Sequence, residues 1–516
     1  MKDHLHPVMF AGTGSDVGKS IIATAFCRIF RQDGYHPAPF KAQNMALNSF
    51  ATPEGLEIGR AQAVQAEAAG VPCHTDMNPL LLKPQSDHTS QVVLNGKPIG
   101  NRDAYDYFRK EGRAELREAV YAAYDRLADH HNPIVMEGAG SLAEVNLRDS
   151  DLVNVPMAMH AGADIILVGD IDRGGVFASV YGSIMLLRPE ERKYVKGILI
   201  NKFRGDLRLF EEGRKMLEDL CGIPVLGVVP YYHDIHIEEE DSVALAAKSA
   251  AAQRGKINVA VVLLRHISNF TDFNVLERDP RVHLFYSNNV DELAKADILI
   301  LPGSKSTLDD LYELRRNGVA QAILRARREG ATVLGICGGY QMMGVQIRDP
   351  HHVEGSIEAM PGLGLLPMVT EMLPEKVTRQ VRFAMDGDVS KDSKDGSDAR
   401  TAGYPPEDFP MEGYEIHMGE TIPVEGSPFT PLNRLEDGQA DGCFVDEKCM
   451  GSYLHGLLDN PAFIDRLLAP HSGKLAEAAA KFDYHAFKEE QYDKLADHVR
   501  KYVDVPLLYD ILRGKR

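Results

Sequence analysis

Cys337 is the residue of this sequence best placed to act as a nucleophile. It stands in the run Gly335-Ile336-Cys337-Gly338-Gly339, directly after the apolar residues 331–334. This order predicts a strand that ends in a sharp turn into a helix, with glycines that allow close approach on both sides of the thiol. Backbone amides at the start of such a helix stabilise an anionic sulfur or an oxyanion. The pattern therefore predicts covalent catalysis by a cysteine.

His455 is the candidate base for this nucleophile. It follows a strand-like run in Gly451-Ser452-Tyr453-Leu454-His455-Gly456, and a base far away in sequence is normal for a Cys/His site. A buried strand at 298–301 leads into a Gly/Ser loop. We expect amides of Gly303, Ser304 and Gly338 to form an oxyanion hole. A single cysteine or histidine is more often structural, but the order and context of these segments favour catalysis.

A phosphate-binding loop is predicted near the other end of the chain. The run Gly12-Thr13-Gly14-Ser15-Asp16-Val17-Gly18-Lys19-Ser20 follows a strand and opens a helix, where backbone amides and a helix N-terminus cradle phosphates. Thr13 stands where the strict motif has glycine, so the loop is a variant. Lys19 is expected to contact the β- and γ-phosphates of ATP, and the Ser20 hydroxyl to face Mg²⁺. The loop residues expected to bind the nucleotide are Gly12, Thr13, Gly14, Asp16, Gly18, Lys19 and Ser20.

Carboxylates follow two further strands of this half. Glu137 ends the buried strand 133–136, where ligand sites of α/β sheets form. Asp170 and Asp172 end the strand at 165–168, next to Arg173. The carboxylates are suited to hold Mg²⁺ or to orient a substrate, and Arg173 is suited to pair with a carboxylate or phosphate. The alternative for Asp172 is a role as a helix cap.

The elements that must position these residues are short apolar strands alternating with helices. The pattern predicts an α/β protein with two doubly wound, mainly parallel-sheet domains, an N-terminal one that carries the P-loop and a C-terminal one that carries Cys337. Helices are predicted at 19–32 and 113–127. Strands are predicted at 8–11, 133–136, 165–168, 197–200, 257–262, 298–301 and 332–334.

The predicted domain boundaries follow shifts in composition. We expect a nucleotide domain at 1–235, a linker at 236–256, a second α/β domain with the Cys/His site at 257–465 and a helical extension at 466–516. Residues 386–406 are rich in Asp, Ser, Lys, Gly and Pro, which is typical of an exposed insertion loop.

Composition excludes several classes of protein. A chain of 516 residues with 44% hydrophobic and 26% charged residues is globular and has several domains. The formal net charge of -18 argues against general nucleic-acid binding. No apolar run is long enough to span a membrane, no secretory signal is apparent, and six scattered cysteines form no disulfide framework. We expect a cytoplasmic enzyme, and a homodimer is the candidate oligomeric state.

The nucleotide half resembles the dethiobiotin-synthase-like ATPases, which activate carboxylates by phosphorylation. The resemblance includes Phe40-Lys41-Ala42-Gln43-Asn44, and it implies that Lys41 faces phosphate and that Glu57 and Glu137 surround the metal. Asn201-Lys202 resembles the base-reading pair of P-loop enzymes.

The other half resembles the class I glutamine amidotransferases, in which cysteine attacks the side-chain amide of glutamine and ammonia leaves. Their usual third catalytic residue is a glutamate two positions after the histidine, but Leu457 stands there. This departure implies a Cys337/His455 dyad, or an orienting acid such as Glu415 or Glu420. The alternatives stay open on the sequence alone.

The combination resembles the cobyrinate and cobyric acid synthases of corrinoid biosynthesis, and the latter more closely. The resemblance implies ATP, Mg²⁺ and glutamine as co-reactants and a corrinoid whose b, d, e and g carboxylates are amidated. Arg60, Lys83, Arg102 and Arg148 are candidates to meet those carboxylates. The alternatives are the earlier a,c-diamide synthase and, from another class, a partition-type switch ATPase that binds a protein partner. The segments that carry the resemblance are 40–45, 57–62, 76–84, 138–141, 170–175, 267–273 and 413–419.

Overall fold

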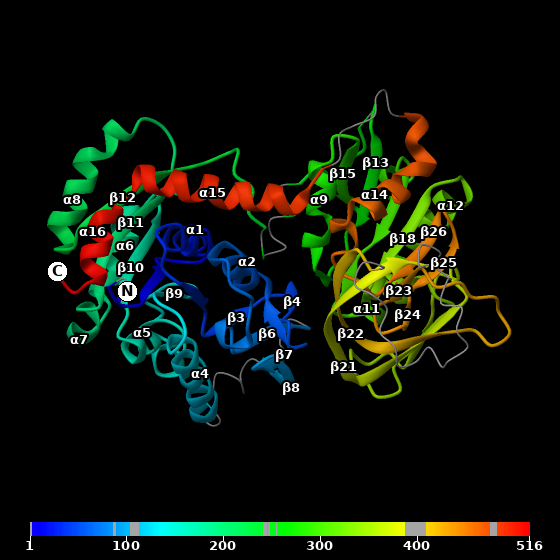
Figure 1. The fold of residues 1–516 in the computed structure, drawn as a ribbon, viewed down its shortest axis with the longest axis horizontal. Coiled ribbons are helices and arrows are strands. Elements are labelled where there is room, and N and C mark those ends of the chain that lie inside the picture. Colours follow the sequence, from blue (N-terminus) through cyan, green and yellow to red (C-terminus); the bar gives the residue numbers. More distant parts are fainter. Residues whose placement is uncertain are drawn as a thin grey trace. The chain divides into compact units, whose positions relative to one another are not determined.

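The chain folds into two compact units, which are described here separately (Figure 1). This computed structural model describes residues 3–85, 89–103, 113–238, 240, 245, 248–253, 255–386, 409–474 and 482–515. Unit 1 contains Met1–Ala46, Ile58–Glu238 and His485–Arg516, and unit 2 contains Leu47–Glu57 and Glu239–Tyr484. Each unit therefore includes a segment distant in sequence from its main part. Residues 387–408, which hold most of the predicted insertion loop, lie outside the described residues.

Unit 1 is built on a parallel sheet with the strand order β12-β11-β10-β1-β9-β2. Its central strands are short apolar runs that are buried along most of their length, as expected for strands covered on both faces. The strands predicted at 8–11, 133–136, 165–168 and 197–200 are confirmed. The bounds are β1 Val8–Gly12, β2 Ala38–Phe40, β9 Ile134–Glu137, β10 Asp164–Asp170, β11 Val195–Phe203 and β12 Val225–Pro230.

Helices pack along this sheet: α1 contacts β1 and β9, α6 contacts β10, and α8 contacts β12 (Figure 1). The predicted helix at 19–32 is confirmed with both of its ends, and the one at 113–127 ends one residue later than predicted. The bounds are α1 Lys19–Gln32, α2 Arg60–Ala69, α4 Arg113–Ala128, α5 Val155–Ala161, α6 Val176–Met185, α7 Pro189–Arg192 and α8 Glu211–Cys221. A smaller sheet of unit 1 contains β3 Gln43–Met45, β6 Leu80–Pro84, β7 Thr89–Leu94 and β8 Lys97–Asp103.

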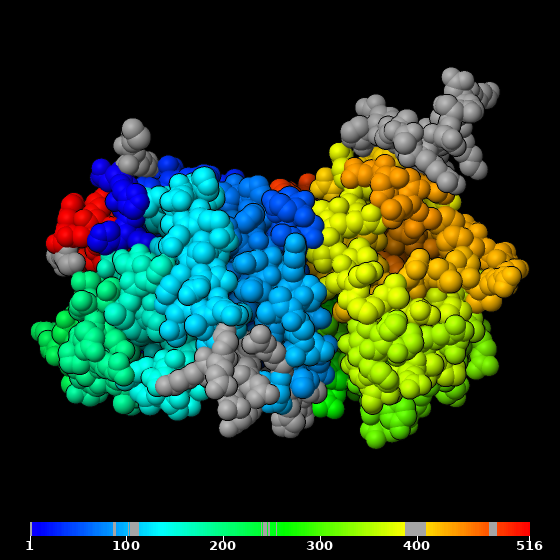
Figure 2. Space-filling view, turned by 90° about the horizontal axis from the view of Figure 1, so that it is seen from below, coloured from blue at the N-terminus to red at the C-terminus, as the bar shows by residue number. Residues whose placement is uncertain are grey.

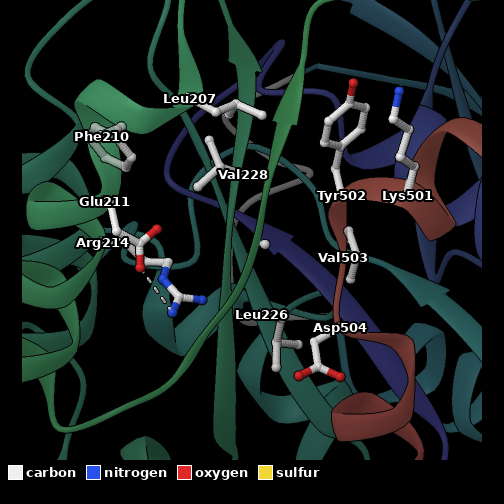
Figure 3. Close-up of a pocket in the computed structure, with 11 residues that line it drawn as sticks. Leu207, Phe210, Glu211, Arg214, Leu226, Val228, Lys501, Tyr502, Val503 and Asp504 are labelled. Atoms are coloured by element: carbon white, nitrogen blue, oxygen red, sulfur yellow. Dashed lines mark ion pairs between the residues drawn. The ribbon is translucent and has the colours of Figure 1, made fainter.

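The C-terminal helices α15 (Tyr484–Tyr502) and α16 (Val505–Leu512) belong to unit 1, apart from the first residue of α15. The amide of His6 donates to Leu512 O at 2.7 Å, and Figure 2 shows the C-terminal residues in red beside the N-terminal residues in dark blue. The turn between the two helices runs against β12, where Val503 pairs with Gly227, and Figure 3 shows Val503 near Leu226. Gly227 permits this approach, because a Cβ there would lie 2.3 Å from Tyr502 O.

Unit 2 is built on a sheet with the order β15-β13-β16-β18-β26-β25, in which only β25 is antiparallel. The strands predicted at 257–262, 298–301 and 332–334 are confirmed. The bounds are β13 Ile257–Val262, β15 Val282–Ser287, β16 Ile298–Leu301, β18 Thr332–Ile336, β25 Cys443–Asp446 and β26 Cys449–Ser452. Its helices are α9 Asn274–Arg278, α10 Val290–Leu293, α11 Thr307–Arg316, α12 Val319–Arg328, α13 Gly338–Met343 and α14 Pro461–Leu468.

Smaller sheets complete unit 2. The largest contains two long antiparallel strands, β21 (Met368–Met385) and β22 (Met411–Pro423), with β19 Gln346–Arg348, β20 Ala359–Pro361, β23 Asn433–Leu435 and β24 Ala440–Asp441. A short two-stranded sheet pairs β14 (Ile267–Ser268) with β17 (Gly303–Ser304). The segment Leu47–Glu57 contributes β4 (Ser49–Ala51), and β5 (Glu57–Gly59) starts at its last residue. Among the described residues, no helix is both long and apolar enough to cross a membrane.

Candidate active sites

Cys337 occupies the turn between β18 and α13, as the sequence predicts. Its backbone is strained, with φ 53° and ψ −113°, which is unusual for a residue with a side chain. Glycine is required after it, because a Cβ on Gly339 would lie 2.0 Å from Leu301 O and one on Gly338 would lie 2.9 Å from Ser304 N. The turn is therefore an elbow on which β16 and α13 approach closely.

The other functional groups of unit 2 follow neighbouring strands of the same sheet. The strand order brings the carboxyl ends of β13, β16, β18 and β26 to one edge, where ligand sites of parallel sheets form. Cys337 follows β18, His455 follows β26, and Ser304 follows β16. Asp272 comes after β13, in the short 3₁₀ helix Phe270–Phe273.

Asp272 orients His455. The Nδ1 atom of His455 lies 2.7 Å from Asp272 Oδ2, and the amide of Gly456 donates to Asp272 Oδ1 at 3.3 Å. Both side chains are buried, with His455 1% and Asp272 5% exposed. Burial lowers the pKa of His455, but the charges of Asp272 and Cys337 outweigh it and raise the pKa to about 10. The types and placement of Cys337, His455 and Asp272 suit a nucleophile, a base and an acid that orients the base.

Glu415 and Glu420, which the sequence offered as alternatives for the orienting acid, have other surroundings. Glu415 pairs with Arg379, which also binds Asp437, and Glu420 is exposed. Asp272 lies in the segment 267–273, which carries part of the family resemblance, but the sequence did not identify it as a partner of His455. Asp272 and His455 are 183 residues apart, so no local pattern connects them. The one available signal is that both follow strands whose carboxyl ends lie at the same edge of the sheet.

The predicted oxyanion residues lie next to the nucleophile. The strand β17 pairs with β14, which holds Gly303 and Ser304 beside the start of α13. A Cβ built on Gly338 would lie 2.9 Å from Ser304 N, so the backbones of these two residues approach each other closely. A Cβ on Gly303 would also lie 3.4 Å from His455 Cε1, so this loop runs along the catalytic histidine.

The predicted phosphate loop of unit 1 connects β1 to α1. Gly18 stands before α1 with φ 96°, where a Cβ would lie 2.1 Å from Asn201 Nδ2. Lys19 donates to Gly14 O at 2.8 Å and to Gly140 O at 3.0 Å. Burial lowers the pKa of Lys19 to about 8, partly opposed by the charge of Glu137. Thr13 N donates to Val168 O at 3.0 Å, which fixes the start of the loop.

Glu137 is the centre of a polar network beside this loop. Its Oε1 accepts hydrogen bonds from Ser20 Oγ and Lys41 Nζ, each at 2.8 Å, and its Oε2 accepts one from Gln65 Nε2 at 2.7 Å. Burial raises the pKa of Glu137, but Lys41 and these hydrogen bonds hold it below its ordinary value. Ser20, Lys41 and Glu137 are thus brought together as predicted.

Asn201 and Lys202 reach the loop from the end of β11. Asn201 Nδ2 donates to Val17 O at 2.9 Å, and Lys202 Nζ donates to Asp16 O and to Asp170 Oδ2, the latter at 3.0 Å. The carboxyl ends of β1, β9, β10 and β11 therefore supply one continuous polar edge. Within the described residues, no group of three or more His, Cys, Asp and Glu side chains is arranged to hold a metal ion by itself.

Other predicted binding residues have protein partners. Glu57 belongs to unit 2, where it accepts from Ser49 Oγ at 2.7 Å and pairs with Lys376. Arg60 pairs with Glu238, and Arg148 donates to Leu186 O at 2.7 Å. Lys83 is buried on β6, and the side chain of Arg102 lies outside the described part of the chain. The metal role of Glu57 and the corrinoid contacts stay predictions.

Comparison with known proteins matches both halves. Residues 8–243 match the CobQ/CobB/MinD/ParA nucleotide binding domain, and residues 258–463 match the CobB/CobQ-like glutamine amidotransferase domain. A protein named cobyric acid synthase from Bacteroides fragilis is 74% identical over 99% of both chains. Proteins of the same name are 70% identical in Phocaeicola vulgatus, over 100% of both chains, and 49% identical in Syntrophobacter fumaroxidans, over 98% of both chains.

Proposed function

The chain belongs to the cobyric acid synthase family, and we propose that it amidates the b, d, e and g carboxylates of adenosylcobyrinic acid a,c-diamide to give adenosylcobyric acid. ATP and glutamine are the co-reactants, as its nucleotide-binding and amidotransferase domains require. The observation that carries the proposal is the presence of a Cys337–His455–Asp272 site and a phosphate loop on a chain 74% identical to such an enzyme.

The glutaminase half-reaction uses the residues of unit 2. Cys337 Sγ attacks the side-chain amide carbon of glutamine, and the amides of Ser304 and Gly338 stabilise the oxyanion. His455 protonates the departing nitrogen, so ammonia leaves and a thioester forms. Water then attacks the thioester with His455 as base, which releases glutamate and restores the thiol. Asp272 keeps the imidazole oriented during both proton transfers.

The synthetase half-reaction uses the residues of unit 1. A carboxylate is a poor electrophile, so the γ-phosphoryl group of ATP is transferred to it and ADP leaves. Ammonia attacks the acyl phosphate, and phosphate leaves as the amide forms. Lys19 and Lys41 offset the negative charge on the transferred group, while the loop amides from Gly12 to Ser20 hold the phosphates. Asn201 and Lys202 are proposed to bind the base of the nucleotide.

Ser20 and Glu137 would hold Mg²⁺. Their hydroxyl and carboxylate oxygens lie 2.8 Å apart at the phosphate loop, and oxygen donors of this kind suit Mg²⁺ completed by phosphates and water. Bound Mg²⁺ would supply positive charge that stabilises the negative charge on the transferred phosphoryl group. Lys41 donates to the same Glu137 oxygen, and its ammonium group would pair with the phosphates beside the metal.

The test is mass spectrometry of the corrinoid after incubation with the enzyme, ATP, Mg²⁺ and amide-¹⁵N glutamine. Four labelled amides are expected. Cys337→Ala should lose them and regain amidation with free ammonia, because only the nitrogen supply is removed. A corrinoid that stays unchanged with ammonia and ATP would contradict the proposed acceptor. In that case the next measurement is amidation of the precursor of the a,c-diamide, which tests the earlier synthase reaction. ATP hydrolysis stimulated by a protein partner would test the switch ATPase.

A further inference from the structure

The segment Leu47–Glu57 lies in sequence between Lys41 and Gln65 of the phosphate site but belongs to unit 2. We propose that this segment positions the Asp272–His455 pair and that glutamine hydrolysis depends on it. The inference rests on the glutaminase half-reaction proposed above and not on the identity of the acceptor carboxylates. Every contact that carries it lies within unit 2.

The segment binds the backbone that precedes Asp272. Asn48 Oδ1 accepts a hydrogen bond from the amide of Phe270 at 3.2 Å, and the amide of Ser49 donates to Asn269 Oδ1 at 2.9 Å. Asn48 is itself fixed, because its Nδ2 donates to Glu240 O at 2.8 Å. Two consecutive residues of the segment therefore hold two consecutive residues of the loop.

This loop sets the position of Asp272. Asn269 has φ 51° and ψ 39°, a left-handed conformation that asparagine adopts more readily than most residues, and it starts the 3₁₀ turn Phe270–Phe273. Within that turn the amide of Asp272 donates to Asn269 O at 3.1 Å. A shift of Asn269 or Phe270 would thus move the carboxylate that lies 2.7 Å from His455 Nδ1.

The segment also reaches His455 by a second route. The rings of Tyr414 and His455 stack with centroids 5.2 Å apart, and the two backbones exchange hydrogen bonds of 3.0 and 2.8 Å. Phe50 packs edge-on against Tyr414, with centroids 4.6 Å apart, and the Tyr414 hydroxyl lies 3.5 Å from Ser49 O. The histidine is therefore backed by an aromatic ring that the segment holds.

The segment is anchored firmly enough to act as a support. Glu57 accepts from Ser49 Oγ at 2.7 Å and pairs with Lys376, which ties its two ends to β21. The amide of Thr52 donates to Leu56 O at 2.7 Å across its turn, and Gln380 Nε2 donates to Ala51 O at 2.8 Å. This arrangement assigns Asn48 and Glu57 a positioning role for the catalytic pair.

The experiment is a double-mutant cycle that measures glutamate release by the full-length enzyme. Asn48→Ala removes the acceptor for the Phe270 amide, and we expect kcat for glutamine hydrolysis to fall about 10- to 100-fold with little change in the KM for glutamine. In an Asp272→Asn background the same substitution should lower kcat by no more than about twofold, because its effect passes through Asp272. Equal losses in both backgrounds, or an unchanged kcat in Asn48→Ala alone, would overturn the proposal.

Matched variants separate positioning from general destabilisation. Asn48→Asp retains an acceptor oxygen and should recover most of the activity, whereas Asn48→Ser is too short to reach the amide and replaces Asn48→Ala if that variant does not fold. Asn289→Ala removes a capping asparagine of α10 in the same unit and should leave glutamate release unchanged. ATP- and ammonia-dependent amidation and the unfolding temperature report on the rest of the molecule. A loss of glutaminase activity in Asn289→Ala equal to that in Asn48→Ala would also overturn the proposal.

Discussion

His455 and Asp272, 183 residues apart in sequence, share a buried hydrogen bond of 2.7 Å between Nδ1 and Oδ2. The bond selects the tautomer in which Nε2 is available to the thiol and stabilises the imidazolium that forms when it takes a proton. The class I amidotransferases that this half resembles carry a glutamate two positions after the histidine, whereas this chain has Leu457 there and pairs the histidine with Asp272. The acid therefore comes from the end of a different strand.

Asp272→Asn should lower kcat for glutamine hydrolysis by about 10²- to 10⁴-fold, as loss of the orienting acid does in comparable sites. Because the charges of Asp272 and Cys337 together raise the pKa of His455 to about 10, removal of the Asp272 charge should also shift the alkaline limb of the pH profile to lower pH. Steady-state glutamate release between about pH 6 and about pH 10.5 measures both effects. Glu415→Gln and Glu420→Gln are the controls, and a larger loss in either would reassign the acid.

ATP affinity should depend on the ionisation of Lys19. Its pKa of about 8 lies below the ordinary value because of burial, so the ammonium is present below pH 8 and is lost as the pH rises above it. The dissociation constant for ATP should therefore increase at alkaline pH, at most about tenfold per pH unit. Calorimetric titration of the nucleotide at several pH values tests this. Lys19→Arg should bind ATP with a flat profile, since guanidinium stays charged, and a slope equal to that of the wild type would point to another group.

Glu137→Gln should impair the use of Mg²⁺ without affecting glutamine hydrolysis. The amide removes the negative charge that Ser20, Lys41 and Gln65 now surround, so we expect ATP-dependent amidation with ammonia to fall about 10²-fold or more at saturating Mg²⁺. Titration of activity with Mg²⁺ after chelation gives the apparent affinity. Glu57→Gln tests the second predicted metal ligand: its pairing with Lys376 favours an unchanged Mg²⁺ curve, and a shifted curve would restore Glu57 to the metal site.

Gly339→Ala should destabilise unit 2 and disable the nucleophile. The added methyl group would meet Leu301 O at 2.0 Å, a clash with backbone that cannot move aside easily, and the cost should be about 1–3 kcal/mol or more. Thermal unfolding together with alkylation of Cys337 measures the two effects. Gly473→Ala in the same unit has no atom within 4 Å of its new methyl group and should behave like the wild type. Normal alkylation and stability of Gly339→Ala would argue against a tightly packed elbow.

Local patterns made much of the fold predictable. The helix at 19–32 begins directly after a glycine-rich loop, and buried strands such as 298–301 are unbroken apolar runs, so both are visible in a short window of sequence. The same holds for Cys337 and Lys19, because their neighbours specify an elbow and a phosphate loop. Their roles depend on local backbone geometry, which local sequence encodes.

The residues that sequence could not assign depend on strand order. Asp272 is a carboxylate in an aromatic segment, and only the pairing of β13 with β16, and of β16 with β18, carries it to the nucleophile. Asn48 and Ser49 look like part of the nucleotide half, yet their hydrogen bonds lie in unit 2. Long-range contacts of this kind leave no periodicity in the sequence.

The exchange of segments between the two units limits how the gene can be divided. A cut between residues 238 and 239, where the chain passes from unit 1 to unit 2, would leave the C-terminal polypeptide without Leu47–Glu57 and the N-terminal polypeptide without His485–Arg516. Each polypeptide would then lack a segment of the unit that it mainly forms, so the two halves of the gene cannot be exchanged as separate domains. A chimera that takes its glutaminase from one species and its synthetase from another must therefore be joined at residues 46/47, 57/58 and 484/485 as well.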